Sequence, residues 1–205
     1  RGVALLLLAM SVATWVVAIY KGWVLQRAAR SLPLAVAAFW QARDIDDGER
    51  RLRALDAHGI VHPLLSAATG LQADLPDTLA VAGDRSQRLT RVLRDALHGV
   101  LTRLQYGQTL LASVGATAPF VGLLGTVWGI HQALAAIGAQ ERFRIEQVAG
   151  PVGEALVMTA AGLAVAIPAV LAYNLFGQWV ASCEAALEGF AHDLREMFSD
   201  APQAS

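Results

Sequence analysis

Three long stretches of this chain are almost free of charged residues, and they constrain its fold more than any other feature. Residues 2–20 and 104–140 contain no Asp, Glu, Lys or Arg, and residues 147–183 contain only Glu154. Each stretch exceeds the ~18 residues that distinguish a transmembrane helix from a buried core helix. At about 1.5 Å per residue, even the shortest would cross the hydrocarbon layer as a helix. We therefore predict three transmembrane helices.

The composition agrees with a chain that is largely surrounded by lipid. Hydrophobic residues make up 55% of the sequence, charged residues make up 16%, and the mean hydropathy is +0.45. Soluble domains usually contain about 45–50% apolar and about 25% charged residues. The formal net charge of -1 gives no general attraction to nucleic acid. The sequence predicts an all-α, polytopic membrane protein that binds no nucleic acid. Its single cysteine, Cys183, cannot form an intramolecular disulfide and is expected to be a packed apolar side chain.

The first stretch has a second interpretation. A short leucine run followed by Ser11-Val12-Ala13 resembles a secretory signal with a cleavage site. The apolar stretch continues beyond that point, however, and ends at Tyr20, Lys21 and Trp23, which are residue types typical of a membrane interface. We expect a transmembrane helix here. Because the sequence starts with arginine and not methionine, it leaves open whether the natural chain begins further upstream.

The distribution of Lys and Arg predicts the orientation. Twelve of the sixteen lie in residues 21–103, and a cluster from Lys21 to Arg30 directly follows the first span. Basic residues that flank a span remain in the cytoplasm, so the N-terminus is expected outside and the C-terminus inside. The predicted segments are a first transmembrane helix at 2–20, a cytoplasmic helical segment at 21–105, a second transmembrane helix at 106–137, an outer loop at 138–147, a third transmembrane helix at 148–177 and a cytoplasmic extension at 178–205.

The segment after the first span is predicted to contain helices joined by breakers. The run Asp44-Ile45-Asp46-Asp47 offers candidate N-caps for a helix through Arg53 and Leu55, which Gly59 and Pro63 then end. Residues 66–83 are small and polar, and they read as a loop or a weak helix. A capping box that begins at Asp84 is expected to start the next helix.

Apolar residues at helical spacing extend both long spans into polar sequence. The stripe before the second span comprises Leu89, Val92, Leu93, Leu97, Val100, Leu101 and Leu104. The stripe after the third span comprises Val180, Cys183, Leu187, Phe190, Leu194 and Met197. We expect one uninterrupted helix through the second span and another, roughly 70 Å long, from Pro151 to Phe198. The two extensions predict a cytoplasmic helical bundle that is shared between copies of the chain.

Small residues are frequent in the second and third spans, where they allow helices to approach closely in lipid. The second span carries Gly122, Gly125 and Gly129, and the third carries Gly162 among several alanines. One chain with three spans cannot cover both sets of small residues. A homo-oligomer is therefore expected.

Three polar residues in these spans are candidates for function. Glu154 is the one carboxylate, and a charge within a bilayer costs about 3 kcal/mol and usually faces a bundle interior or a water path. A place near the outer interface would explain it without a function. Thr126 and Thr159 fall near the middle of their spans, although a lone threonine is often satisfied by its own helix. An ideal helix rotates Thr159 by about 140° from Glu154, so these side chains are expected to flank one pore surface.

Two segments resemble the ExbB/TolQ family of membrane proteins. Residues 118–130 read Ala-Pro-Phe-Val-Gly-Leu-Leu-Gly-Thr-Val-Trp-Gly-Ile, which is similar to the second-span motif of the family. The third-span motif is matched by Gly-Glu-Ala-Leu at 153–156, Thr159, Gly162, Ala-Ile-Pro-Ala-Val at 166–170 and Tyr173-Asn174. Elsewhere the resemblance rests on topology. It is greater to the ExbB branch than to the TolQ branch, and the sequence departs from the family pattern at His131 and at Val157-Met158.

The resemblance implies a pentamer in the bacterial inner membrane, with a pore lined by the second and third spans. It implies a dimer of an ExbD-like single-span subunit in that pore, and a TonB-like energy transducer that receives the work of proton flow. It places Thr126, Glu154 and Thr159 on the proton pathway and makes residues 138–147 periplasmic. No cofactor is expected.

Other functions fit these residues less well. The sequence contains no nucleophile–base set or phosphate-binding loop that would indicate an enzyme. His58 and His62 have helical spacing, but Gly59 interrupts it, so no metal site is expected. A membrane scaffold without ion conduction explains the small-residue faces but not the polar residues. Within the family, the alternatives to a subunit that energises TonB-dependent outer-membrane import are a TolQ-like subunit of the envelope-maintenance motor and, more distantly, a flagellar stator of the MotA type.

Overall fold

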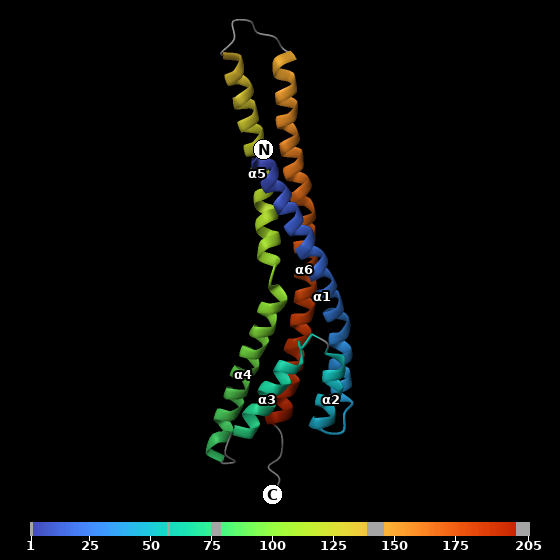
Figure 1. Ribbon diagram of the computed structural model, residues 1–205. Coiled ribbons are helices and arrows are strands. Elements are labelled where there is room, and N and C mark those ends of the chain that lie inside the picture. Colours follow the sequence, from blue (N-terminus) through green and yellow to red (C-terminus); the bar gives the residue numbers. More distant parts are fainter. Residues whose placement is uncertain (1, 57, 75–78, 139–145, 200–205) are drawn as a thin grey trace. The chain divides into compact units, whose positions relative to one another are not determined.

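A computed structural model describes residues 2–56, 58–74, 79–138 and 146–199 of the chain. Within these ranges the protein consists of six helices and contains no strand, which confirms the predicted all-α fold (Figure 1). The helices are α1 (Gly2–Trp40), α2 (Ile45–Leu55), α3 (His62–Asp74), α4 (Leu79–Gln105), α5 (Gln108–Gly138) and α6 (Glu146–Ser199). They form two compact units: the first contains Arg1–Gly22 and Gly107–Phe176, and the second contains Trp23–Tyr106 and Gly177–Ser205.

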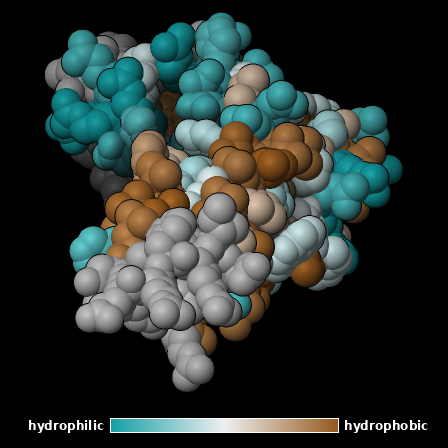
Figure 2. All heavy atoms as spheres, turned by 90° about the horizontal axis from the view of Figure 1, so that it is seen from above, coloured by the Kyte–Doolittle hydropathy of each residue, from teal (hydrophilic) through white to brown (hydrophobic). Residues whose placement is uncertain are grey.

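Three helices contain segments long and apolar enough to cross a membrane, as predicted: Gly2–Trp40, Gln108–Ala135 and Ala149–Ser199. Large apolar side chains on these helices are exposed; Ile19 and Phe120, for example, are 68% and 70% exposed. Figure 2 shows hydrophobic residues reaching the molecular surface instead of being confined to the interior. Such a surface is suited to lipid and not to water. The chain is a polytopic membrane protein, whereas the limits of each span within its helix stay predictions.

The core of the first unit lies where the N-terminal part of α1 packs against α5 and α6 (Figure 1). Its buried residues are Leu7 of α1, Val114 and Ala118 of α5, and Val165, Ala166 and Ala169 of α6. Half of them are alanines, whose short side chains let the helix backbones lie close together. In lipid, where apolar side chains gain little from leaving the solvent, such close packing is the main source of helix association.

The second span does not continue directly from the preceding helix. α4 ends at Gln105 and α5 begins at Gln108, and Gly107 between them has φ of 86°. This left-handed conformation carries no steric penalty for glycine, because glycine has no Cβ. A Cβ at this position would also lie 3.2 Å from Cγ1 of Val17. The prediction of one uninterrupted helix is therefore wrong, and Gly107 is the breaker that it missed.

The third span and its extension do form one helix, because α6 runs without a break from Glu146 to Ser199. The predicted stripe on this helix is buried in the second unit, except that Phe198 closes it in place of the half-buried Met197. The stripe on α4 is buried at Leu89, Leu93, Val100, Leu101 and Leu104. Both stripes are covered within one chain. Their burial does not require the second copy that the sequence led us to expect.

The ends of the shorter helices partly follow the sequence signals. Of the candidates at residues 44–47, Asp44 is the N-cap of α2, and its carboxylate accepts a hydrogen bond of 2.7 Å from the backbone N–H of Asp47. Asp84, by contrast, lies inside α4, which begins at Leu79, so the predicted start at a capping box is wrong. Of the stretch that read as a loop or a weak helix, residues 66–74 belong to α3.

A buried carboxylate connects α2 to α3. Asp56 follows α2, and its side chain accepts hydrogen bonds from the backbone N–H groups of Ile60, Val61 and His62 at 2.7, 2.8 and 2.9 Å. Asp56 is only 9% exposed. It satisfies donors that the first turn of a helix leaves without intrahelical partners.

We expect Asp56→Ala to lower the free energy of unfolding of the chain by about 2–3 kcal/mol, because two buried N–H groups and one partly buried N–H group would lose their acceptor. Thermal unfolding in detergent, followed by tryptophan fluorescence, measures this change. Asp95→Ala is the matched control, since Asp95 is exposed on α4. Equal destabilisation by both substitutions would contradict the role assigned to Asp56.

Candidate functional site

A close approach between two membrane helices joins Gly122 of α5 to Gly162 of α6. A Cβ added to Gly122 would lie 2.6 Å from the carbonyl oxygen of Met158 and 3.1 Å from the Cα of Gly162. A Cβ added to Gly162 would lie 2.6 Å from the carbonyl oxygen of Ala118. Real Cβ atoms do not tolerate such distances, so the backbones of α5 and α6 touch here only because both residues are glycines.

The two helices are antiparallel along this contact. Gly115 faces Val170, Gly122 faces Gly162 and Gly129 faces Ala155, so positions that rise along α5 fall along α6.

Gly125 also lies in a close contact between helices, because a Cβ there would lie 3.0 Å from both Cβ of Met158 and Cγ1 of Val3. All four glycines that the sequence singled out for helix packing therefore face helices of the same chain. They do not by themselves require an oligomer.

Thr126 and Thr159 meet beside this contact. Thr126 is buried, and its hydroxyl donates to the carbonyl oxygen of Gly122 at 3.1 Å. The hydroxyl of Thr159 lies within hydrogen-bond distance of the Thr126 hydroxyl. Either hydroxyl can be the donor of this pair. The sequence predicted both residues, and the structure joins them across the two helices.

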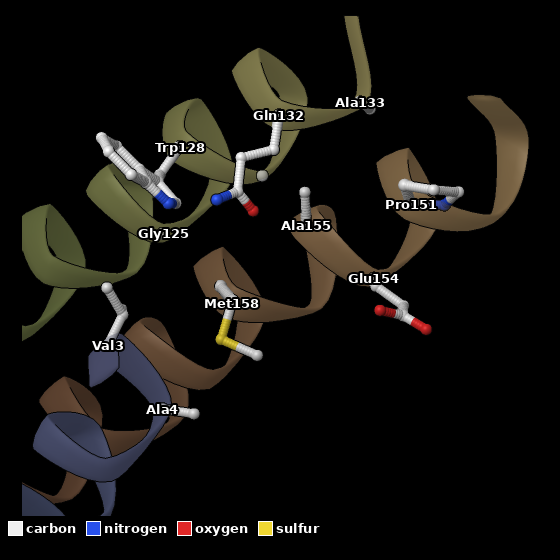
Figure 3. Close-up of a pocket in the computed structure, with 11 residues that line it drawn as sticks. Val3, Ala4, Gly125, Trp128, Gln132, Ala133, Pro151, Glu154, Ala155 and Met158 are labelled. Atoms are coloured by element: carbon white, nitrogen blue, oxygen red, sulfur yellow. The ribbon is translucent and has the colours of Figure 1, made fainter. Parts of the chain in front are cut away.

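Glu154 is not part of the hydroxyl pair. Its side chain is exposed and lines an open pocket together with Val3 and Ala4 of α1 and Gln132 of α5. Figure 3 shows its carboxylate directed away from α5, whereas the next residue, Ala155, faces α5. The structure therefore brings together two of the three predicted polar residues and leaves Glu154 apart from them.

Helix geometry explains this separation. Met158 lies on the side of the helix pair where Val3 of α1 packs. Glu154 precedes Met158 by one turn of α6, so it lies on the same side as Met158. Thr159 is one residue further on and is rotated by about 100°. The carboxylate of Glu154 and the hydroxyl pair therefore lie on different sides of the α5–α6 pair.

Gln132 is a polar residue of this pocket that the sequence analysis missed. It lines the pocket with Glu154, and in Figure 3 its amide extends from α5 toward Ala155 of α6. The available signal was an uncharged amide two turns after Gly125 in a predicted membrane span. His131, which departs from the family motif, is exposed, and its ring lies 6.1 Å from that of Trp128.

The two histidines considered for a metal site have separate contacts. His58 packs edge-on against Trp23, with 6.3 Å between ring centroids. His62 lies 3.2 Å from Oε1 of Glu49, which also accepts a hydrogen bond of 2.6 Å from Arg53. These two contacts, first His62 and then Arg53, lower the pKa of Glu49. In the part of the chain that the structure describes, no group of three His, Cys, Asp or Glu is arranged to hold a metal ion.

The fold and the site define a class: a helical protein of three apolar spans, with polar side chains placed between and beside two closely packed membrane helices. Residues 51–189 match the MotA/TolQ/ExbB proton channel family, and the chain belongs to this family. The predicted resemblance is confirmed. With its three apolar helices, the chain is a multi-pass protein of the bacterial inner membrane, and its family consists of transport-motor subunits and not of enzymes.

Relatives cover most of the chain. It is 44% identical over 212 residues to the biopolymer transport protein ExbB of Xanthomonas campestris pv. campestris (strain B100), an alignment that covers 96% of this chain and 80% of the relative. It is 40% identical over 195 residues to the biopolymer transport protein ExbB of Neisseria meningitidis serogroup A, covering 94% and 89%. Identity to the Tol-Pal system protein TolQ of Pseudomonas aeruginosa is 32% over 176 residues, covering 85% and 76%.

Proposed function

We propose that this chain is the proton-channel-forming subunit of an inner-membrane motor that uses the proton motive force to energise TonB-dependent outer-membrane import. The observation that carries the proposal is its 44% identity to a protein named ExbB over nearly its whole length. Identity to TolQ, at 32%, is lower and covers less of the chain. The similarity to TolQ supports an alternative function, a TolQ-like role in envelope maintenance.

The geometry of the site supports a proton pathway. A hydroxyl group both donates and accepts hydrogen bonds, so the pair of Thr126 and Thr159 can orient water or a carboxyl group that approaches it. Glu154 offers an exposed carboxylate in a helix with few other charges near it, where it can accept and release a proton. In the proposed complex α5 and α6 of several copies form a pore, as expected for a pentamer. The hydroxyl pair and Glu154 lie on different sides of the α5–α6 pair, so we propose that they serve the proton pathway from two surfaces.

The proposed partners follow from the same reasoning. An ExbD-like single-span subunit would occupy the pore and bring its own carboxylate to the hydroxyl pair. A TonB-like energy transducer would then receive the mechanical work. Neither proposal depends on a cofactor, because each proton transfer needs only groups that titrate or hold water.

The function is tested by replacement of the native subunit. A bacterial strain that lacks its ExbB-type subunit should regain growth on siderophore-bound iron when this chain is expressed with its own single-span partner. The partner should co-purify with the chain and be identified by mass spectrometry. A strain that lacks TolQ should remain sensitive to detergent, as the matched control. Rescue of the second strain but not the first would favour the TolQ-like alternative, and assembly with the partner without rescue of either would favour a scaffold.

The proposed orientation places the N-terminus in the periplasm and the C-terminus in the cytoplasm, and single cysteines can test it. In a Cys183→Ser background, we expect Gly138→Cys to react with an impermeant thiol reagent on intact spheroplasts and Ser86→Cys to react only after lysis. The reason is that twelve of the sixteen Lys and Arg residues lie between the first two spans, which holds that segment in the cytoplasm. The reverse labelling pattern would overturn the orientation.

A further inference from the structure

One face of α1 in the second unit combines an exposed indole with two arginines. Trp23, Arg27 and Arg30 are spaced by four and three residues and so lie on one side of the helix. Trp23 is 59% exposed. These three side chains, which we call the Trp–Arg face, line a shallow hollow together with Gln26, Ser31 and Leu34.

The indole of the Trp–Arg face is held from two sides. Cζ of Arg27 lies 5.5 Å from the centroid of the Trp23 ring, which is a cation–π contact. His58, from the connection between α2 and α3, packs edge-on against the same ring. Side chains on a helix lean toward its N-terminus, and Arg27 therefore folds back over Trp23 toward the start of α1. The guanidinium is positioned before any ligand arrives.

The arginines of this face are not neutralised by carboxylates. Among the residues that the structure describes, neither Arg27 nor Arg30 has an acidic partner within ion-pair distance. Other arginines of the second unit differ: Arg51 lies 2.8 Å from Asp47, and Arg53 lies 2.6 Å from Glu49. The Trp–Arg face therefore presents two positive charges on exposed side chains.

We propose that the Trp–Arg face binds the phosphate group of an anionic phospholipid. A guanidinium offers a planar fork of N–H donors that matches the oxygens of a phosphate, and an indole is a residue typical of the membrane interface. Trp23 follows Ile19 and Tyr20, which are 68% and 66% exposed at the end of the apolar run of α1. Because this apolar run leads directly to the face, the acyl chains of the same molecule can lie along α1. This continuity favours a lipid over a soluble anion.

The experiment uses the full chain, purified in detergent, and measures lipid binding by native mass spectrometry. Phosphatidylglycerol is titrated against phosphatidylethanolamine, and inorganic phosphate is added as the soluble competitor. We expect the double substitution Arg27→Gln and Arg30→Gln to weaken binding of phosphatidylglycerol by about fivefold for each arginine, or roughly thirtyfold together. The matched control is the double substitution Arg43→Gln and Arg50→Gln, which removes the same charge from exposed positions outside the face and should leave affinity nearly unchanged.

Trp23 provides a second, independent variant. Trp23→Phe keeps an aromatic ring beneath Arg27 and should retain most of the affinity, whereas Trp23→Leu should lose several-fold because no ring remains to position the guanidinium. Size-exclusion chromatography checks that each variant keeps its assembly. If a neutral substitution disturbs the assembly, Arg27→Lys replaces Arg27→Gln in the experiment.

Three results would overturn the proposal. The first is equal weakening by the control pair, which would mean a general attraction to the charge of the chain. The second is equal affinity for phosphatidylethanolamine and phosphatidylglycerol. The third is displacement of the lipid by inorganic phosphate at a similar concentration, which would identify a site for a soluble anion.

Discussion

Gly162→Ala is expected to break the contact between α5 and α6, although it adds only a single methyl group. The new Cβ would lie 2.6 Å from the carbonyl oxygen of Ala118 and 3.0 Å from the Cα of Gly122. Both are backbone atoms, so no side-chain rotation can relieve the clash and the helices must separate. Overpacking usually costs about 1–3 kcal/mol, and we expect this site to lie at or above the upper end. Gly122→Ala should behave alike, since its Cβ would lie 2.6 Å from the carbonyl oxygen of Met158.

Gly153→Ala is the matched control for this prediction. It lies in α6 as well, but a Cβ there would meet nothing within 4 Å. Alanine is favoured over glycine in a helix by about 1 kcal/mol, so the control should be neutral or stabilising. Thermal unfolding in detergent compares the three variants. If Gly162→Ala were as stable as Gly153→Ala, the two helices would not approach as closely as the structure shows.

The same substitution should also affect function. Thr126 donates to the carbonyl oxygen of Gly122, and its partner Thr159 precedes Gly162 by three residues. Separation of the backbones would therefore pull the two hydroxyls apart. We expect any Gly162→Ala protein that does accumulate to lose import, even though it retains every polar residue of the site.

The membrane spans could be predicted from the sequence because a bilayer imposes simple requirements. A helix that crosses it must be about 20 residues long and nearly free of charge, and three helices among the residues that the structure describes contain a stretch that meets both conditions. The apolar stripes of α4 and α6 were predictable for a related reason, because burial on one side of a helix repeats with the helical period.

The break between α4 and α5 could not be predicted in the same way. The sequence around Gly107 is compatible with a helix, and Gly99 and Gly115 lie inside helices only eight residues to either side. Gly107 has a positive φ, and Val17 of α1 packs close to it, 3.2 Å from where a Cβ would lie. The position of α1 is not contained in the local sequence.

The site likewise has a part that the sequence predicts and a part that depends on tertiary packing. Thr126, Thr159 and Glu154 were recognised from residue type and from the family motifs, but their mutual arrangement depends on the rotation of α5 against α6. The glycine contact sets that rotation, and it joins the two hydroxyls while turning Glu154 toward the side that α1 covers. Gln132 was missed for the same reason, because an amide in a largely apolar helix gains meaning only when the structure shows that it lines a pocket with Glu154.

Glu154→Ala is expected to abolish import while leaving the fold intact. Glu154 is exposed in the chain, so its replacement leaves no cavity and breaks none of the hydrogen bonds that the structure describes. Any loss must therefore come from the missing carboxyl group. Glu154→Gln keeps the shape and the hydrogen-bonding groups but cannot carry a proton, so it should also lose import if proton transfer is the role. Residual activity of the glutamine variant alone would indicate that the carboxyl group acts chiefly as a neutral hydrogen-bond donor.

Growth on siderophore-bound iron, in a strain that lacks the native subunit, measures the effect, with expression and assembly checked in parallel. Glu188→Gln is the matched control, because it removes the same charge from an exposed position of the same helix. Thr159→Val should reduce import less completely, since it replaces the hydroxyl that pairs with Thr126 by a methyl group of similar volume. Full growth with Glu154→Ala at normal expression would remove this carboxylate from the proton pathway. The hydroxyl pair would then have to serve the pathway without it. If neither Glu154→Ala nor Thr159→Val reduced growth, the chain would be a scaffold.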